Sequence, residues 1–132
     1  MASSLVKTSV ISDVGTFHCV NLDPDHTVET LDASSGTLYK VEIDNTANIV
    51  PVYVKLYDST STVNVGGDAA TGPDWAFMCP AGGTRVYSSP TGTTYGTGLK
   101  AICVTAAGTD LNGTAASTAP ASNVIYRIHI AT

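Results

Sequence analysis

Histidine and cysteine are the residues of this sequence with the most specific chemistry, because both bind zinc. A zinc site needs three or four such ligands that converge on one point. His18 and Cys19 are adjacent in a segment with strand character, so their side chains point to opposite faces and cannot act as a pair of ligands. His26 lies in a polar turn, and His129 faces outward near the C-terminus. The spacing therefore predicts scattered histidines and cysteines with no metal site.

The three cysteines are predicted to be free thiols. Cys19, Cys79 and Cys103 cannot all pair within one chain, and none belongs to a CxxC motif. Cys103 lies in the most apolar segment, where burial raises the pKa of a thiol and makes it unreactive. We therefore expect buried, inert cysteines and no disulfide framework.

Catalytic and cofactor-binding motifs are not found. No GxSxG sequence is present, and the glycine-rich pieces match neither GxGxxG nor a P-loop. The segment Asp23-Pro24-Asp25 has neither the glycine nor the closing glutamate of an EF-hand loop. The remaining loop carboxylates are typical turn residues; they are Asp44, Asp58, Asp68, Asp74 and Asp110. The sequence predicts a protein that is not an enzyme and has no catalytic, cofactor-binding or metal-binding residues.

Composition excludes two classes of partner. Only 13% of the 132 residues are charged, and 6 Lys+Arg against 11 Asp+Glu give a formal charge of −5. There is no basic stripe to neutralise a phosphate backbone, so nucleic acid is not an expected partner. No apolar run approaches the roughly 18 residues of a membrane span, and the N-terminus lacks the apolar stretch of a signal peptide. We expect a soluble protein made in the cytoplasm, whose surface is kept polar by 19 threonines and 12 serines.

Apolar and polar residues alternate with period two in short segments bounded by glycine, proline, asparagine and serine, which predicts β-strands. In residues 36–43 the predicted inward residues are Thr37, Tyr39, Val41 and Ile43, and the outward residues are Lys40 and Glu42. In residues 50–57 the predicted inward residues are Val50, Val52, Val54 and Leu56. We expect these two segments to form a hairpin.

Four further segments complete the expected strands, at residues 75–79, 84–87, 98–105 and 123–131. The second is expected to stop before Pro90, and the third, apolar on both sides, to be a central strand. In the last, the predicted inward residues are Val124, Tyr126, Ile128 and Ile130, and the outward residues are Arg127 and His129. No stretch has helical spacing over three turns. The sequence thus predicts an all-β sandwich or barrel of about six to eight antiparallel strands, with little or no helix.

Residues 1–35 are less regular than residues 36–132, which we expect to form the β-sandwich domain. They contain a weaker pair of strands, at residues 5–14 and 16–20. Two interpretations remain open. The segment is either an arm that adds a strand to a neighbouring molecule, or it supplies the first strands of the sandwich.

Four side chains are predicted to contact another subunit or a larger assembly. Tyr53, Lys55 and Tyr57 share the face of their strand that points away from the core, where two aromatic rings flanking a lysine stem can cover a partner. Trp75 is the fourth, because aromatic residues commonly anchor interfaces. The alternative is that all four are ordinary half-exposed strand residues.

Two runs resemble small virion proteins of tailed bacteriophages, particularly phages of cyanobacteria: LYKVEIDNTAN at 38–48 and PVYVKLYD at 51–58. Later pieces are similar in order and spacing; they are PDW at 73–75, PAG at 80–82 and YGTGL at 95–99. The resemblance extends over about residues 36–131 and does not include residues 1–35. It implies a jelly-roll-like β-sandwich and a structural role.

The role that the resemblance implies is a cement or decoration protein on the outside of the phage head, located on the capsid surface of the virion. The expected partners are copies of the chain itself, as a homotrimer, and the major capsid protein. A surface rich in hydroxyls suits this role because it costs less to desolvate than lysine or glutamate. The alternative is a tail- or fibre-associated module whose long loops, residues 58–73 and 106–122, recognise a host receptor or glycan.

Overall fold

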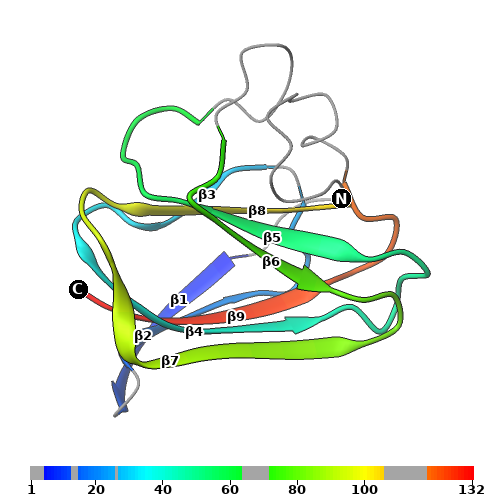
Figure 1. Ribbon diagram of the computed structural model, residues 1–132, viewed down its shortest axis with the longest axis horizontal. Helices are drawn as coiled ribbons and strands as arrows, with labels where there is room; N and C mark the ends of the chain where they lie inside the picture. Colours follow the sequence, from blue (N-terminus) through cyan, green and yellow to red (C-terminus); the bar gives the residue numbers. More distant parts are fainter. Residues whose placement is uncertain (1–4, 13–14, 26, 64–71, 106–118) are drawn as a thin grey trace.

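The computed structural model describes residues 5–12, 15–25, 27–63, 72–105 and 119–132. These residues form nine strands and no helix, arranged as two stacked antiparallel sheets (Figure 1). Sheet A contains, in spatial order, β1 (Leu5–Ser12), β2 (Gly15–Asn21), β9 (Ile125–Ala131), β4 (Gly36–Asp44) and β7 (Thr84–Tyr95). Sheet B contains β3 (Glu29–Asp32), β8 (Leu99–Val104), β5 (Val52–Tyr57) and β6 (Trp75–Cys79). The all-β expectation is confirmed, with one strand more than the predicted upper number.

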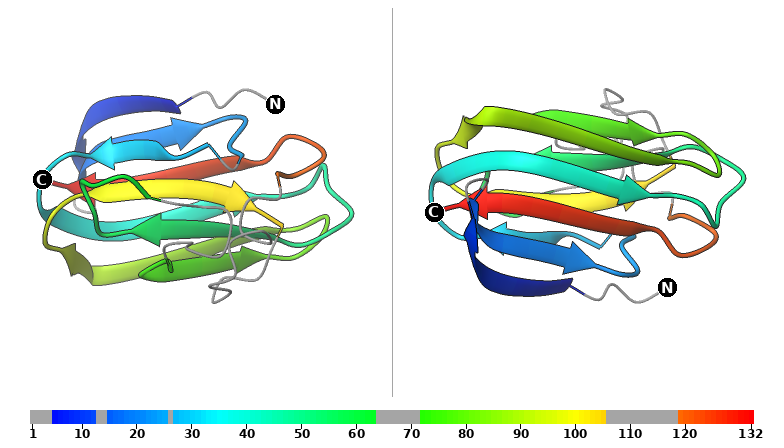
Figure 2. Two further views of the ribbon diagram at one scale, coloured as in Figure 1. Left: turned by 90° about the horizontal axis from the view of Figure 1, so that it is seen from above. Right: turned by 90° about the horizontal axis from the view of Figure 1, so that it is seen from below.

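The strand order is that of a jelly roll. β5 pairs with β6, β4 with β7, β3 with β8 and β2 with β9, so the chain is nested like one long hairpin rolled into two sheets. β1 adds a fifth strand at the edge of sheet A, beside β2. Figure 2 shows the two faces, with sheet B nearest the viewer on the left and sheet A nearest the viewer on the right.

The core lies between the sheets, and a smaller cluster covers the outer side of sheet B. β9 follows the predicted alternation, with Tyr126, Ile128 and Ile130 buried and the residues between them partly exposed. β5 and β8 are buried on both faces, because Tyr57 and Ile102 pack in the outer cluster. The prediction that residues 98–105 form a central strand is therefore confirmed.

A β-bulge in β4 makes part of the predicted inward face wrong. The register with β9 shifts between Leu38 and Lys40, which stand opposite the adjacent residues Ile130 and His129, so Tyr39 is an extra residue relative to β9. Leu38, Val41 and Ile43 are buried, whereas Thr37 and Tyr39 are only partly covered. Period-two alternation changes phase at a bulge, which is why the prediction fails on its N-terminal side.

The predicted hairpin of residues 36–43 and 50–57 is also wrong. β4 and β5 lie in different sheets, as successive strands of a jelly roll commonly do, and Val50 is exposed before β5 begins. The third correction concerns residues 84–87, which continue past Pro90 as the long strand β7. β7 is an edge strand, where a proline that cannot donate a ladder hydrogen bond is tolerated.

The N-terminal residues take part in both sheets. β2 pairs with β9 from Phe17 opposite Ile130 to Asn21 opposite Tyr126, and β3 pairs with β8. Cys19 belongs to the central core. In this structure the described part of residues 1–35 supplies the first strands of the sandwich, and β1 is the only one of them at the edge of sheet A.

Candidate functional site

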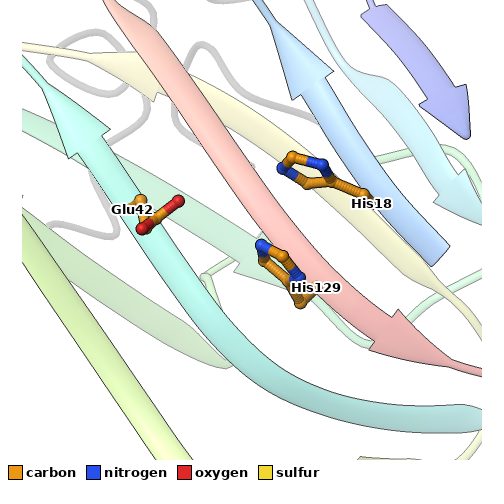
Figure 3. A group of neighbouring side chains, drawn as sticks. All are labelled: His18, Glu42 and His129. Carbon is orange, nitrogen blue, oxygen red and sulfur yellow. The ribbon is translucent and has the colours of Figure 1, made fainter. Parts of the chain in front are cut away.

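Three side chains with metal-ligand chemistry meet on the outer face of sheet A. His18 on β2 stands directly opposite His129 on β9, and Glu42 projects from β4, the next strand (Figure 3). One ligand atom of each residue lies within 4.8 Å of the other two. The two imidazole rings stack, with centroids 4.2 Å apart and planes inclined by 24°. We call these three residues the histidine site.

Burial and the surrounding charges favour the neutral form of His129. Lys40 stands opposite His129 across the β4–β9 pair, and its Nζ lies 3.0 Å from Oε1 of Glu42. Burial lowers the pKa of His129, and the neighbouring His18 and Lys40 lower it further, while Glu42 acts in the opposite direction. A neutral imidazole is the form that binds metal ions.

The expectation that the histidines are scattered is wrong for two of the three. The alternation of apolar and polar residues along each strand correctly places His129 and Glu42 outward. It cannot show that β2, β9 and β4 are neighbours in that order. Only the register brings His18 opposite His129. His26 lies outside the described residues.

The four predicted contact residues divide into two groups. Lys55 and Tyr57 are buried within the chain, so their side chains offer no surface to a partner in this structure. Their predicted exposure is wrong because the outer side of sheet B is covered, with Val63 packing in the same cluster as Tyr57. Tyr53 and Trp75 are half-buried, and their role as contacts remains a prediction.

The β4–β5, β6–β7 and β8–β9 connections come together at the right-hand edge of Figure 1, and we call this end of the sandwich the loop end. Asn45 is fully buried, and its Nδ2 donates to the carbonyl oxygens of Val50 at 2.9 Å and Pro80 at 3.0 Å. Nδ2 of Asn48 donates to Oδ1 of Asn45 at 2.9 Å and to the carbonyl of Ser122 at 3.0 Å. Two asparagines thus join the β4–β5, β6–β7 and β8–β9 connections.

The loop end presents an apolar tip to solvent. Ile49 is 95% exposed, the most exposed of the large hydrophobic side chains described, and the adjacent Val50 is 41% exposed. The buried asparagines on the N-terminal side of Ile49 hold this turn in place. Sequence reasoning identifies the turn from its Asn/Asp content but gives no signal that its apolar tip is exposed and its asparagines buried.

A small hollow opens beside the bulge in β4, between the edges of the two sheets. Tyr39, Phe77 and Tyr87 line it, and its volume is about 100 Å³. Ligand pockets for drug-sized molecules are about 300–1,000 Å³, so this hollow holds only a few solvent molecules or one small group.

The thiols and several tyrosines are buried in the core. Burial raises the pKa of Cys19 to about 11 and also raises the pKa of Cys103, as its apolar strand predicts. All three cysteines are free and buried. Tyr95 and Tyr126 are buried as well.

Comparison with known proteins adds no relative: no family model, no curated protein and no solved structure matches the chain. Within the described residues, no helix has the length and apolar character needed to cross a membrane.

Proposed function

We propose that the chain is a structural virion protein, a cement or decoration protein that binds the outside of a tailed-phage head and stabilises the shell. The observation that carries the proposal is the apolar tip of the loop end. A side chain as exposed as Ile49, on a turn tied by the hydrogen bonds of Asn45 and Asn48, is suited to anchoring a protein partner because a backbone already held in place loses little conformational entropy on binding.

The strand order and the sequence support the same role. Jelly rolls build viral capsid and lectin domains as well as cupins, so the fold alone does not decide between them. The resemblance of residues 36–131 to small phage virion proteins favours the first class. The predicted partners are copies of the chain and the major capsid protein, and many weak contacts repeated around a shell add through avidity.

The test uses virions of the source phage. Mass spectrometry of purified virions is expected to detect the chain, and immunogold labelling is expected to mark the head. Labelling confined to the tail or fibres would support the alternative of a receptor-binding or glycan-binding module. Detection in infected cells together with absence from virions would contradict both readings.

The loop end can be tested separately. Heads from a phage lacking the gene are incubated with purified protein, and the bound protein is measured after sedimentation. Ile49→Ser is expected to weaken binding at least about tenfold, as loss of a central apolar anchor does. Val86→Ser is the matched control, because Val86 is also exposed but lies on β7. Equal binding by both variants would exclude the loop end as the docking surface.

A further inference from the structure

The donors of the histidine site lie on rigid elements at near-coordinating distances. Three atoms that are 4.8 Å or less from one another have a common point no more than about 2.8 Å from each, and zinc lies about 2.0–2.2 Å from histidine and carboxylate ligands. Small side-chain rotations of His18, Glu42 and His129 therefore close the site. Adjacent strands hold all three Cα atoms, and sites on strands are more precise than sites on loops.

Each imidazole also has a buried nitrogen that lacks a protein partner. Nε2 of His18 and Nδ1 of His129 are inaccessible to solvent and have no hydrogen-bond partner among the described residues. Buried polar atoms in folded proteins nearly always have a partner, so two such nitrogens in one stacked pair need an explanation. This observation is independent of the distances between the ligand atoms, and a metal ion bound to the rings would supply a partner for nitrogens of this kind.

Lys40 competes with a metal ion for the carboxylate of Glu42. Glu42 is paired with Lys40, both side chains are about 30% exposed, and Arg127 stands opposite Glu42 on β9. An ion pair of this exposure contributes little to stability. A divalent ion, with two charges and direct coordination, displaces the lysine at small cost.

We infer that His18, Glu42 and His129 form a binding site for a divalent transition-metal ion, with Zn²⁺ as the best match. Two imidazoles and one carboxylate suit zinc, whereas magnesium and calcium prefer oxygen ligands alone. Three protein ligands leave one position of a tetrahedral ion open for water or for a donor from a partner. The site joins β2, β9 and β4 and does not depend on the proposed virion role.

The experiment titrates the full-length, untagged chain with Zn²⁺ and with Co²⁺. Calorimetry is expected to give one ion per chain, and Co²⁺ is expected to give the intense visible absorption of four-coordinate cobalt. His18→Gln, His129→Gln and Glu42→Gln are each expected to weaken binding at least about tenfold. Lys40→Gln is expected to strengthen binding about fivefold, because it removes the competing ion pair.

Two controls keep the inference falsifiable. His26→Gln removes the remaining histidine and is expected to leave binding unchanged. Long-range ¹H–¹⁵N spectra of the wild-type imidazoles give a readout that needs no variant, since Zn²⁺ is expected to shift the nitrogens of His18 and His129 only. Absence of binding to the wild type, or binding that survives loss of both imidazoles, would overturn the inference.

Discussion

Asp58 fixes the turn between β7 and β8 through hydrogen bonds that depend on its negative charge. Its carboxylate accepts from the backbone N–H groups of Gly96 at 2.8 Å and Thr97 at 2.9 Å, and from the Thr97 hydroxyl at 2.9 Å. These bonds, led by the one from Gly96, lower the pKa of Asp58 to about 2. One side chain therefore holds a turn that follows it by almost forty residues.

Asp58→Asn is expected to destabilise the fold by about 1–2 kcal/mol at pH 7, the lower part of the range for charged hydrogen bonds because this group is solvent-exposed. An aspartate with a folded pKa near 2 and an unfolded pKa near 3.9 adds stability above about pH 4 and loses it as pH falls toward 2. Urea unfolding at several pH values should therefore show the wild type and Asp58→Asn converging below pH 4.

A difference between Asp58→Asn and wild type that persists unchanged to pH 2 would contradict the assigned role of the charge.

At the scale of single residues, the sequence shows which side chains are suited to a turn or to a metal ion. It does not show which groups elsewhere in the chain they contact. Asp58 is recognisable as a turn residue, but the N–H groups that it accepts from belong to another connection. The same holds for the histidine site, because His18 and His129 are more than a hundred residues apart and only the β2–β9 register joins them.

At the scale of elements, β7 carries extra residues where it pairs with β4, because Thr93 stands opposite Leu38 and Ser88 opposite Lys40. Gly92 has φ = 80°, and a Cβ there would lie 2.1 Å from Cγ2 of Thr37 and 3.1 Å from Cε1 of Tyr39. A larger residue therefore meets both an unfavourable backbone conformation and a steric clash. Glycine is required here by the packing of the strand.

Gly92→Ala is expected to destabilise the protein by about 2–4 kcal/mol in urea unfolding. Gly82→Ala is the matched control: Gly82 also has positive φ, at 67°, but its Cβ would meet nothing within 4 Å, so a loss of about 1 kcal/mol is expected. Adding Thr37→Ser removes Cγ2 and is expected to restore part of the loss at Gly92. Equal effects at the two glycines would show that the clash is relieved at no cost.

The N-terminal strands differ in how much of the fold depends on them. β1 contacts only β2 through strand pairing, whereas β2 pairs with β9 and carries Cys19 into the core, and β3 carries Leu31. Deleting residues 1–14 is expected to leave cooperative thermal unfolding, and deleting residues 1–35 is expected to abolish it. A folded chain after the longer deletion, judged by circular dichroism and a sharp transition, would contradict the role of β2 and β3 in the sandwich.

Strand existence is predictable from the sequence, but strand partnership is not. The alternation in β9 follows the burial pattern residue by residue, because the extra residue of the β4–β9 pair lies on β4 and not on β9. In β4 the bulge at Tyr39 reverses the phase of the alternation, and no residue in the sequence marks it. The pairing of β4 with β7 and β9, and not with β5, is set by the nesting of the whole chain, which local periodicity does not record.

At the scale of the whole molecule, the open question is how many copies associate. The chain has a mass of 13.5 kDa, and the proposed cement role predicts a closed cyclic trimer. Size-exclusion chromatography with light scattering is expected to give three times that mass. Tyr53, half-buried on the outer face of sheet B, is the predicted subunit contact, because Lys55 and Tyr57 beside it are buried within the chain.

Tyr53→Ser is therefore expected to shift the mass toward that of the monomer. The folded state should survive, because the Tyr53 side chain is only half-buried and its exposed part is available to a partner subunit. Val86→Ser, an exposed position on the other sheet, should keep the trimer mass. A monomeric wild type would exclude a preformed trimer and leave docking to the loop end of single chains. A trimer unaffected by Tyr53→Ser would instead move the contact to Trp75 or to the outer face of sheet A, where added Zn²⁺ would then be the next variable in the same mass measurement.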